Sequence, residues 1–303
     1  MTACIAVLCA VLLSAQPCGA QPSPDETSLS VLSYNVHGVS RFIAKDNPRD
    51  RSPTIGWLAS RYDLVLLQED FEYHDLIAAQ MPGRATFRGN GVGRDLRRVA
   101  AKALLFPAAV LLPRFSPPYG AGLTTLVDAR KLEASDPQRQ PYTACNGWMR
   151  GRANCWAAKG FLRVRIRLSN GAAVEVYNTH LDAGPGERSK AVRRQQLDEL
   201  AEGIERLSGE RAVIAAGDFN CAFGRPGDGD LLMSFRERVG LDDSGAGPEL
   251  PVWRERDYVL YRGGPGVTLA VDEAGEAGEF VSDRRALSDH AALFVRFRAR
   301  VVP

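Results

Sequence analysis

The sequence predicts an α/β protein in which short strands alternate with helical stretches. Several segments have the polar/apolar alternation or the continuous apolar runs of strands, and residues 187–207 place apolar side chains at helical spacing. Loops rich in glycine and proline separate these elements. At 303 residues the chain can bury a sizeable core, and no break in composition requires a second domain.

The predicted strands follow one another along the chain. Residues 29–34 alternate apolar and polar side chains, whereas residues 63–68 form an apolar run typical of a strand covered on both faces. Residues 161–168 place an aromatic residue and three arginines on one face and four aliphatic residues on the other. The Ser-Asn-Gly turn at 169–171 then predicts a hairpin with residues 173–179. The remaining predicted strands are residues 212–216, 258–261 and 291–297.

The amino-terminal residues have the pattern of a secretory signal peptide. An apolar run at 5–13 is too short to span a bilayer, and Cys18-Gly19-Ala20 offers a small-residue cleavage site. No lysine or arginine precedes the run, which is unusual for a signal peptide; a buried N-terminal helix is the alternative. We expect a signal peptide at 1–20, a linker at 21–28, one domain at 29–300, and a secreted or periplasmic protein.

Composition and charge exclude several classes of protein. The chain has 38 Lys and Arg against 36 Asp and Glu, a formal net charge of +2, and 45% hydrophobic residues. These values exclude a disordered chain, a collagen-like fibre and a polybasic nucleic-acid tail. Because the net charge is near zero, any affinity for phosphate must come from local clusters. Beyond the amino terminus, no segment is apolar for long enough to cross a membrane, so we expect no transmembrane segment.

Removal of residues 1–20 would leave three cysteines, Cys145, Cys155 and Cys221. In an oxidising compartment Cys145 and Cys155 are the natural pair, since they close a short polar loop. A zinc site would need further cysteines or histidines nearby, and the sequence has none there. We therefore expect a Cys145–Cys155 disulfide and a buried free thiol at Cys221.

Acids, amides and histidines lie at the ends of the predicted strands. Such residues converge at one rim of a sheet or sandwich, where functional sites are built. Three or more acid or amide oxygens there suit a hard cation such as Mg²⁺, and histidines beside it supply proton transfer or phosphate contacts. Each residue alone has an ordinary structural interpretation. The strand-end residues are Asn35, Glu69, His180, Asp218, Asn220, Asp257, Asp289 and His290.

The order of the motifs that contain these residues carries more weight than any single motif. The series is Ser33-Tyr34-Asn35, Gln68-Glu69, Asn178-Thr179-His180, Gly217-Asp218-Phe219-Asn220, Asp257-Tyr258 and Ser288-Asp289-His290. It closely resembles the endonuclease/exonuclease/phosphatase family, which includes pancreatic-type deoxyribonucleases, abasic-site endonucleases, inositol-phosphate phosphatases and neutral sphingomyelinases. The resemblance runs from about residue 29 to residue 298. It implies an α/β (α+β) four-layer sandwich, with two packed mixed β-sheets flanked by helices.

The resemblance also implies a Mg²⁺- or Mn²⁺-dependent hydrolase of phosphate esters. At the matching positions, Glu69 would be the principal metal ligand, with Asn35 and Asp289 around the same ion. The reaction would be in-line displacement at phosphorus, in which charge stabilisation by a metal and two imidazoles does most of the work.

Five further residues take catalytic roles by the same resemblance. Asp218 and Asn220 would orient and activate the attacking water. His290, held by Asp257, would act as an acid/base or phosphate clamp, and His180 would contact a phosphoryl oxygen. The division of the general-base role between Asp218 and the His290–Asp257 pair stays open.

Other positions depart from the family pattern or have no clear role in it. The family's Gly-Leu-x-x-Leu-Ser-Arg segment is replaced here by residues 122–130, which puts recognition by that loop in doubt. We interpret Asp182 as a loop carboxylate and His74 as a structural residue. His37 lies near Asn35 and could face the site, but we favour a surface imidazole.

The substrate is less well defined than the reaction. One basic run spans residues 150–167 and another spans 94–102, and each is either a solvated face or an attraction for polyanions. Lys159-Gly160 resembles a segment of the secreted sphingomyelinase-like branch, which makes Lys159 a candidate substrate contact. Trp148 and Trp156 flank the cysteine loop and could enter a lipid interface, stack on bases or pack.

Three hypotheses follow for a monomer that acts on a phosphate ester. We favour a secreted phosphodiesterase of the sphingomyelinase-like branch that cleaves phospholipid headgroups, with peripheral membrane contact. The second hypothesis is a secreted nuclease acting on DNA or RNA with the same catalytic set. The third is an inactive phosphate- or membrane-binding module, which the intact set of polar residues disfavours.

Overall fold

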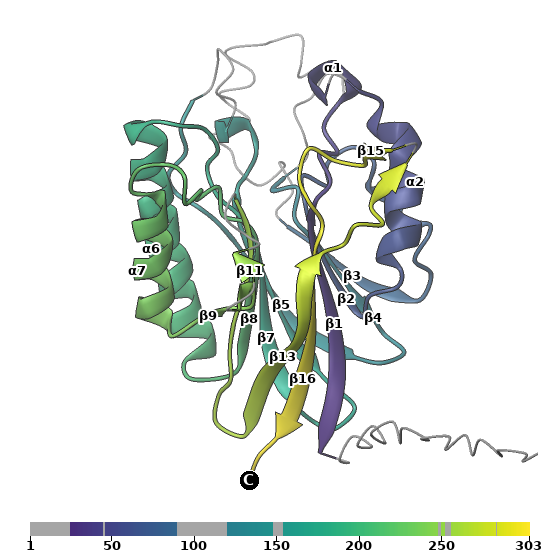
Figure 1. Ribbon diagram of the computed structural model, residues 1–303, viewed down its shortest axis with the longest axis vertical. Coiled ribbons are helices and arrows are strands. Elements are labelled where there is room, and N and C mark those ends of the chain that lie inside the picture. Colours follow the sequence, from purple (N-terminus) through teal and green to yellow (C-terminus); the bar gives the residue numbers. More distant parts are fainter. Residues whose placement is uncertain are drawn as a thin grey trace, which may run out of the picture.

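Two six-stranded sheets pack face to face, with helices on the outside of each (Figure 1). This arrangement confirms the four-layer sandwich with mixed sheets. The predicted signal peptide lies outside the described residues. The computed structural model describes residues 25–44, 46–89, 120–147, 154–247, 250–251, 256–282 and 284–303.

The first sheet has the strand order β13-β16-β1-β2-β4-β3. β1 runs parallel to β2 and antiparallel to β16. Three of its strands were predicted, although β1 begins three residues earlier than expected and β16 runs on to Val301. The strands are β1 (Glu26–Asn35), β2 (Leu64–Gln68), β3 (Arg84–Arg88), β4 (Thr124–Asp128), β13 (Val267–Glu276) and β16 (Leu293–Val301).

The second sheet has the order β5-β6-β7-β8-β12-β9. β6 and β7 form the predicted hairpin, whose turn is closed by a 2.9 Å bond from the Gly171 N–H to the Leu168 carbonyl. β7 runs parallel to β8, and β12 antiparallel to it. The strands are β5 (Glu133–Pro141), β6 (Gly160–Arg167), β7 (Ala173–His180), β8 (Val213–Asp218), β9 (Asp242–Asp243) and β12 (Asp257–Arg262).

Helices cover the outer face of each sheet (Figure 1). α6 (Glu187–Ser208), the predicted amphipathic helix, packs with α7 (Asp228–Val239) outside the second sheet, and α2 (Pro48–Ala59) lies outside the first. None of the helices in the described ranges is long and apolar enough to cross a membrane. The short elements are α1 (Arg41–Ala44), α3 (His74–Ala78), η3 (Asn154–Trp156) and two small hairpins, β10 (Ala246–Gly247) with β11 (Leu250–Pro251) and β14 (Val281–Ser282) with β15 (Arg285–Ala286).

β2 shows why the apolar runs are continuous. Leu64 and Leu66 pack into the core between the two sheets, whereas Val65 and Leu67 pack into a second cluster under α2. All four side chains are fully buried, and each such burial contributes about 1.5–3 kcal/mol. Both faces of the strand are therefore covered, as the run of apolar residues predicts.

The topology brings one end of several strands to a single edge. The carboxyl ends of β1 and β2 lie together, with Asn35 opposite Gln68, and those of β7 and β8 place His180 opposite Asp218. Because β12 is antiparallel to β8, Asp257 at its amino end pairs with Asp218. β16 begins at the same edge, since it is antiparallel to β1.

The cysteines behave as predicted. Cys145 and Cys155 form a disulfide, and Cys221 is a buried free thiol. Burial raises the pKa of the Cys221 thiol to about 12, so it is a weak nucleophile at neutral pH.

Candidate catalytic and metal site

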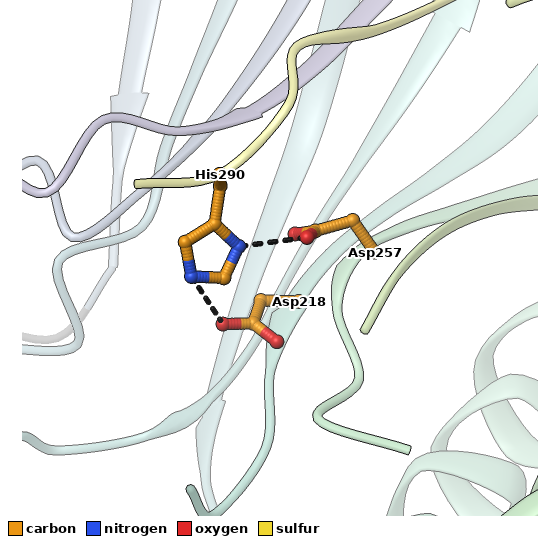
Figure 2. A group of neighbouring side chains, drawn as sticks. All are labelled: Asp218, Asp257 and His290. Carbon is orange, nitrogen blue, oxygen red and sulfur yellow. Dashed lines mark hydrogen bonds and ion pairs between the residues drawn. The ribbon is translucent and has the colours of Figure 1, made fainter. Parts of the chain in front are cut away.

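His290 lies between two carboxylates at the shared edge (Figure 2). Its Nδ1 is 2.7 Å from Asp257 Oδ2, and its Nε2 is 3.8 Å from Asp218 Oδ2. Burial alone would lower the pKa of His290, but the hydrogen bond and charge of Asp257 outweigh burial and raise the pKa. The ring is therefore positively charged near neutral pH and can donate a proton or bind a phosphoryl oxygen.

Asp218 is the carboxylate toward which both site histidines point. Its burial would raise its pKa, but its electrostatic interactions with His180, His290 and Lys159 together lower it. Its Oδ1 accepts the backbone N–H of Asn220 at 2.9 Å. Asp218 is thus an ionised, fixed acceptor that can orient a water molecule, as the resemblance implies.

Asn35 joins the two sheets at this point. Its Nδ2 donates to Asp218 Oδ2 at 3.1 Å and lies 3.4 Å from His290 Nε2, while its Oδ1 accepts the His37 N–H at 3.0 Å. The structure therefore brings a residue of the first sheet into contact with the catalytic carboxylate of the second. Asn220 Nδ2 donates instead to the Leu181 carbonyl at 3.0 Å, which fixes the turn after β8.

His180 is buried beside Asp218. Its Nε2 lies 3.3 Å from Asp218 Oδ2 and 4.0 Å from Glu69 Oε1. Burial, helped by the charge of Lys159, lowers the pKa of His180 to about 3, so the ring is neutral at physiological pH. Lys159 lies 2.8 Å from the same Nε2 and donates to the Leu181 carbonyl at 2.6 Å. Lys159 therefore belongs to the site rather than to an exposed basic face.

Glu69 is held at the edge by its backbone. It has a positive φ of 53°, and its carbonyl accepts the N–H groups of Gly38 and Phe71, both at 2.9 Å. A side chain at position 38 would place its Cβ only 2.7 Å from that carbonyl oxygen, so the contact requires glycine. Strain of this kind is common at functional sites.

Asp289 is half-exposed and carries a second carboxylate to the edge. Its Oδ1 lies 2.8 Å from His37 Nδ1, and this hydrogen bond raises the pKa of His37. The interpretation of His37 as a surface imidazole is therefore wrong, because the backbone turn after Asn35 directs the ring to Asp289. No hydrogen bond within the described ranges uses the Glu69 carboxylate as an acceptor. The carboxylates of Glu69 and Asp289 and the amide oxygen of Asn35 are oxygen donors of the kind that a hard divalent cation prefers.

Asp218, Asp257 and His290 are a second group with metal-ligand chemistry, since their ligand atoms lie within 4.8 Å of one another. However, both ring nitrogens of His290 face carboxylates, and the raised pKa favours the protonated ring. A protonated imidazole has no lone pair for a metal. We call this trio the proton-transfer group. The family resemblance would place a cation at Glu69, Asn35 and Asp289 instead.

Five expected features lie apart from this cluster or outside the described residues. His74 pairs with Asp70 at 2.6 Å, and Asp182 accepts hydrogen bonds from loop residues, as expected of structural groups. Trp148 and the basic run at 94–102 fall outside the described residues. Trp156 ends η3, but its side chain also falls outside the description.

The polyanion interpretation is wrong for Arg163 and Arg165. Arg163 is 1% exposed, with Nη2 2.5 Å from Glu175 Oε2, and Arg165 Nη2 lies 2.8 Å from Glu175 Oε1. A signal for this pairing was present in the sequence. The hairpin turn at 169–171 places Arg165 directly opposite Glu175, so the register predicts a cross-strand ion pair.

Several residues that support the site from the protein interior were not predicted from the sequence. Gln68 donates to Asn178 Oδ1 at 2.9 Å, which links the two sheets under the site. Arg51 of α2 donates to the carbonyls of Val36 and Leu287, and so ties together the segments that carry Asn35 and His290. Gln68 and Asn178 stood within the motifs already noted, but a helix arginine gives no such signal.

A cavity of about 300 Å³ opens beside the proton-transfer group. Ser288, Asp289 and His290 form one wall, and apolar side chains, including Phe280 and Val281, line much of the rest. Glu276 also lines the cavity, and none of the described lining residues is a lysine or arginine. A largely apolar space therefore adjoins the proton-transfer group.

The comparisons with known proteins agree with this geometry. The sequence pattern described as "Endonuclease/Exonuclease/phosphatase family" matches residues 32–290. Sphingomyelinases of Mycobacterium bovis and Mycobacterium tuberculosis are 31% identical to this chain over 288 residues, covering 88% of this chain and 52% of theirs. The chain therefore spans about half the length of the curated relatives it matches.

Solved structures show the same fold at lower identity. Sphingomyelinase C from Streptomyces griseocarneus superposes with a TM-score of 0.60 at 20% identity, covering 89% of this chain and 99% of that one. A mutant beta toxin from Staphylococcus aureus with bound magnesium ions gives a TM-score of 0.58 at 14% identity, covering 91% of this chain and 100% of that one.

Proposed function

The chain belongs to the endonuclease/exonuclease/phosphatase family, and we propose that it is a metal-dependent phosphodiesterase that hydrolyses phospholipid headgroup esters, as a sphingomyelinase does. The observation that carries the reaction class is the cluster at the shared sheet edge. There a neutral His180 and a charged His290 lie 3.3 Å and 3.8 Å, respectively, from the carboxylate of an ionised Asp218. Such a set can activate water and stabilise charge on a phosphoryl group at the same time.

The roles of the chain's own residues follow from their protonation states. Asp218, fixed by Asn35 and the Asn220 N–H, orients the attacking water and accepts its proton. His290, held by Asp257, donates a proton to the leaving oxygen. His180 and Lys159 supply hydrogen bonds and positive charge on the other side of Asp218.

A Mg²⁺ or Mn²⁺ ion would be held by Glu69, Asp289 and Asn35. When bound, it would supply positive charge against the charge that develops on the phosphoryl oxygens.

Three observations favour a phospholipid over a nucleic acid. The curated relatives at 31% identity are sphingomyelinases. Arg163 and Arg165, which could have followed a nucleic-acid backbone, are used in ion pairs with Glu175. The cavity beside His290 is largely apolar and has no basic residue among its described lining residues, which suits a headgroup such as choline better than a polyanion.

We further propose that the protein is exported. The apolar amino-terminal run and the Cys145–Cys155 disulfide both support an oxidising compartment. Thiol titration of the exported chain under denaturing, non-reducing conditions should find one reactive group, Cys221. Three reactive thiols would contradict the export proposal.

An assay panel tests the substrate class. The mature protein with Mg²⁺ is incubated with vesicles of sphingomyelin or phosphatidylinositol-type lipids, with plasmid DNA and with RNA. Release of phosphocholine is the expected result. Rapid plasmid or RNA degradation without phosphocholine release would support a nuclease instead, and no turnover of any substrate would favour an inactive binding module.

A further inference from the structure

The loop closed by the Cys145–Cys155 disulfide has a second closure at its base. Asn146 and Asn154, the residues just inside the two cysteines, both donate to Asp182. The Asn146 N–H is 2.8 Å from Asp182 Oδ2, and Asn154 Nδ2 is 3.2 Å from Oδ1. We call these four loop residues and Asp182 the neck.

The neck is attached to the strand end that carries His180. Asp182 is fully buried two residues after His180, and its N–H donates to Gln196 Oε1 of α6 at 2.7 Å. Asn154 also exchanges hydrogen bonds with the backbone of Ala183, at 3.0 Å in both directions. Both ends of the loop are therefore fixed to the segment that leaves the catalytic edge.

Lys159 follows the neck by four residues and returns to the same segment. Its ammonium donates to the Leu181 carbonyl at 2.6 Å and lies 2.8 Å from His180 Nε2. Lys159 is 6% exposed, and within the described ranges it forms no ion pair with a carboxylate. Burial of an ammonium is unfavourable without such a partner, so the backbone must hold this side chain in place.

We propose that Asp182 is a positioning residue, whose carboxylate closes the neck and thereby holds the Lys159 ammonium against His180. The proposal rests on the proposed function, because the consequence is catalytic. With the neck closed, Lys159 adds a fixed positive charge beside His180 and Asp218, where the phosphoryl group would react. With the neck open, the chain between Cys155 and β6 would gain freedom, and the ammonium would move toward water.

Asp182→Asn is the main test variant. It keeps the size of the side chain but turns an amide NH₂ toward a donor, so one of the two neck bonds is lost. We expect kcat on a phosphodiester to fall roughly 10-fold or more with little change in KM, since misplacement of a catalytic group acts mainly on the reacting state. Asp128→Asn is the matched control, because Asp128 is equally buried but lies at the end of β4, paired with Arg130.

A double-mutant cycle separates positioning from a general structural effect. If Asp182 acts through Lys159, Asp182→Asn should have little further effect in a Lys159→Met background. Asn154→Ala, which removes the other partner of the carboxylate, should slow the wild-type enzyme in the same direction and also lose its effect in that background. Equal rate losses with and without Lys159 would overturn the proposal, as would full activity of Asp182→Asn.

A second measurement is independent of activity. Amine labelling followed by mass spectrometry should find Lys159 protected in the wild-type protein and modified at least about 10-fold faster in Asp182→Asn, with Asp128→Asn unchanged. Unchanged protection in both Asp182→Asn and Asn154→Ala would overturn the proposal. An inactive wild-type protein with the expected labelling pattern would instead contradict only the proposed function.

Discussion

The molecule contains two histidine–aspartate pairs with nearly the same contact and different surroundings. His290 Nδ1 is 2.7 Å from Asp257, and His74 Nδ1 is 2.6 Å from Asp70. In each pair the second carboxylate oxygen, Oδ1, is buried and has no hydrogen-bond partner among the described residues. The contact alone therefore does not distinguish a catalytic pair from a structural one.

The second ring nitrogen distinguishes the two pairs. His290 Nε2 faces Asp218 at 3.8 Å and Asn35 at 3.4 Å, groups that belong to different sheets. His74 lies on α3, one turn from Asp70, and the only side-chain bond the described structure gives its ring is the one to Asp70. A histidine becomes a candidate catalyst when its free nitrogen points into a cluster built by several elements.

Removal of the divalent cation should reduce turnover more than any of the substitutions below. Glu69 and Asp289 bring two carboxylates to the edge beside His290, and without a cation their charge would oppose an anionic phosphate ester. We expect chelation to abolish turnover, and Mg²⁺ or Mn²⁺ to restore it, while thermal unfolding shows that the fold around His74 persists. Full turnover in chelator would contradict the metal assignment.

His290→Ala should have the next largest effect. The substitution removes a charged acid held by Asp257 and in reach of Asp218. A general acid–base group typically contributes about 10²–10⁴-fold, so kcat should fall by that order while the protein stays folded. Steady-state kinetics on the substrate identified by the assay panel checks the expectation. A loss no larger than that of His74→Ala would show that the site is assigned to the wrong pair.

Asp257→Asn should shift the dependence of kcat on pH, whereas the matching change in the His74 pair should not. Asp257 raises the pKa of His290, and an acid works only below its pKa, so activity is lost as the pH rises through that value. The variant lowers that pKa, and the alkaline limb of kcat against pH should move to lower pH. Asp70→Asn is the control and should leave the limb in place. An unmoved limb in Asp257→Asn would mean that another group titrates there.

Some strands were predicted from the pattern of their apolar residues, whereas β3, β4, β5 and β13 were not. β2 and β7 gave clear signals because their faces meet defined layers, whereas β5 did not. β5 is an edge strand with mostly exposed residues, Pro137 and a bulge between Ser135 and Gln138, so no period of two survives. An exposed edge strand of this kind has no alternation of apolar and polar residues, so its sequence alone does not predict it.

The site residues that lie at the ends of predicted strands could themselves be predicted from the sequence. Asn35, Asp218 and His290 follow or precede recognisable strands, so their convergence followed from topology. The His37–Asp289 pair did not, because it depends on a residue with a positive φ of 45° that turns the chain back. The contact of Lys159 with His180 depends on the disulfide loop that connects the paired strands β5 and β6, and no sequence period describes such a loop.

Gly38→Ala should have a moderate effect on kcat and on the Mg²⁺ requirement, because it disturbs the sheet edge beside His290. The new Cβ would meet the Glu69 carbonyl at 2.7 Å, so the turn that presents the Glu69 carboxylate must shift. A displacement of this size should lower kcat roughly 10-fold and raise the Mg²⁺ concentration needed for half-maximal rate. Gly224→Ala is the control, because no atom of the described residues lies within 4 Å of a Cβ at that position. Equal metal requirements for the two variants would show that the glycine contact does not position Glu69.

His74→Ala should have the smallest effect on catalysis and a measurable effect on stability. Asp70 is 1% exposed, and loss of its imidazole partner leaves a buried carboxylate without that bond, which typically costs about 1–3 kcal/mol. Because Asp70 adjoins Glu69, the rate should fall by no more than a few-fold. Denaturant unfolding and kcat should be measured together, with His74→Gln as the variant that keeps a hydrogen-bonding group. If His74→Ala were as slow as His290→Ala at unchanged stability, the second nitrogen would not be what separates the two pairs.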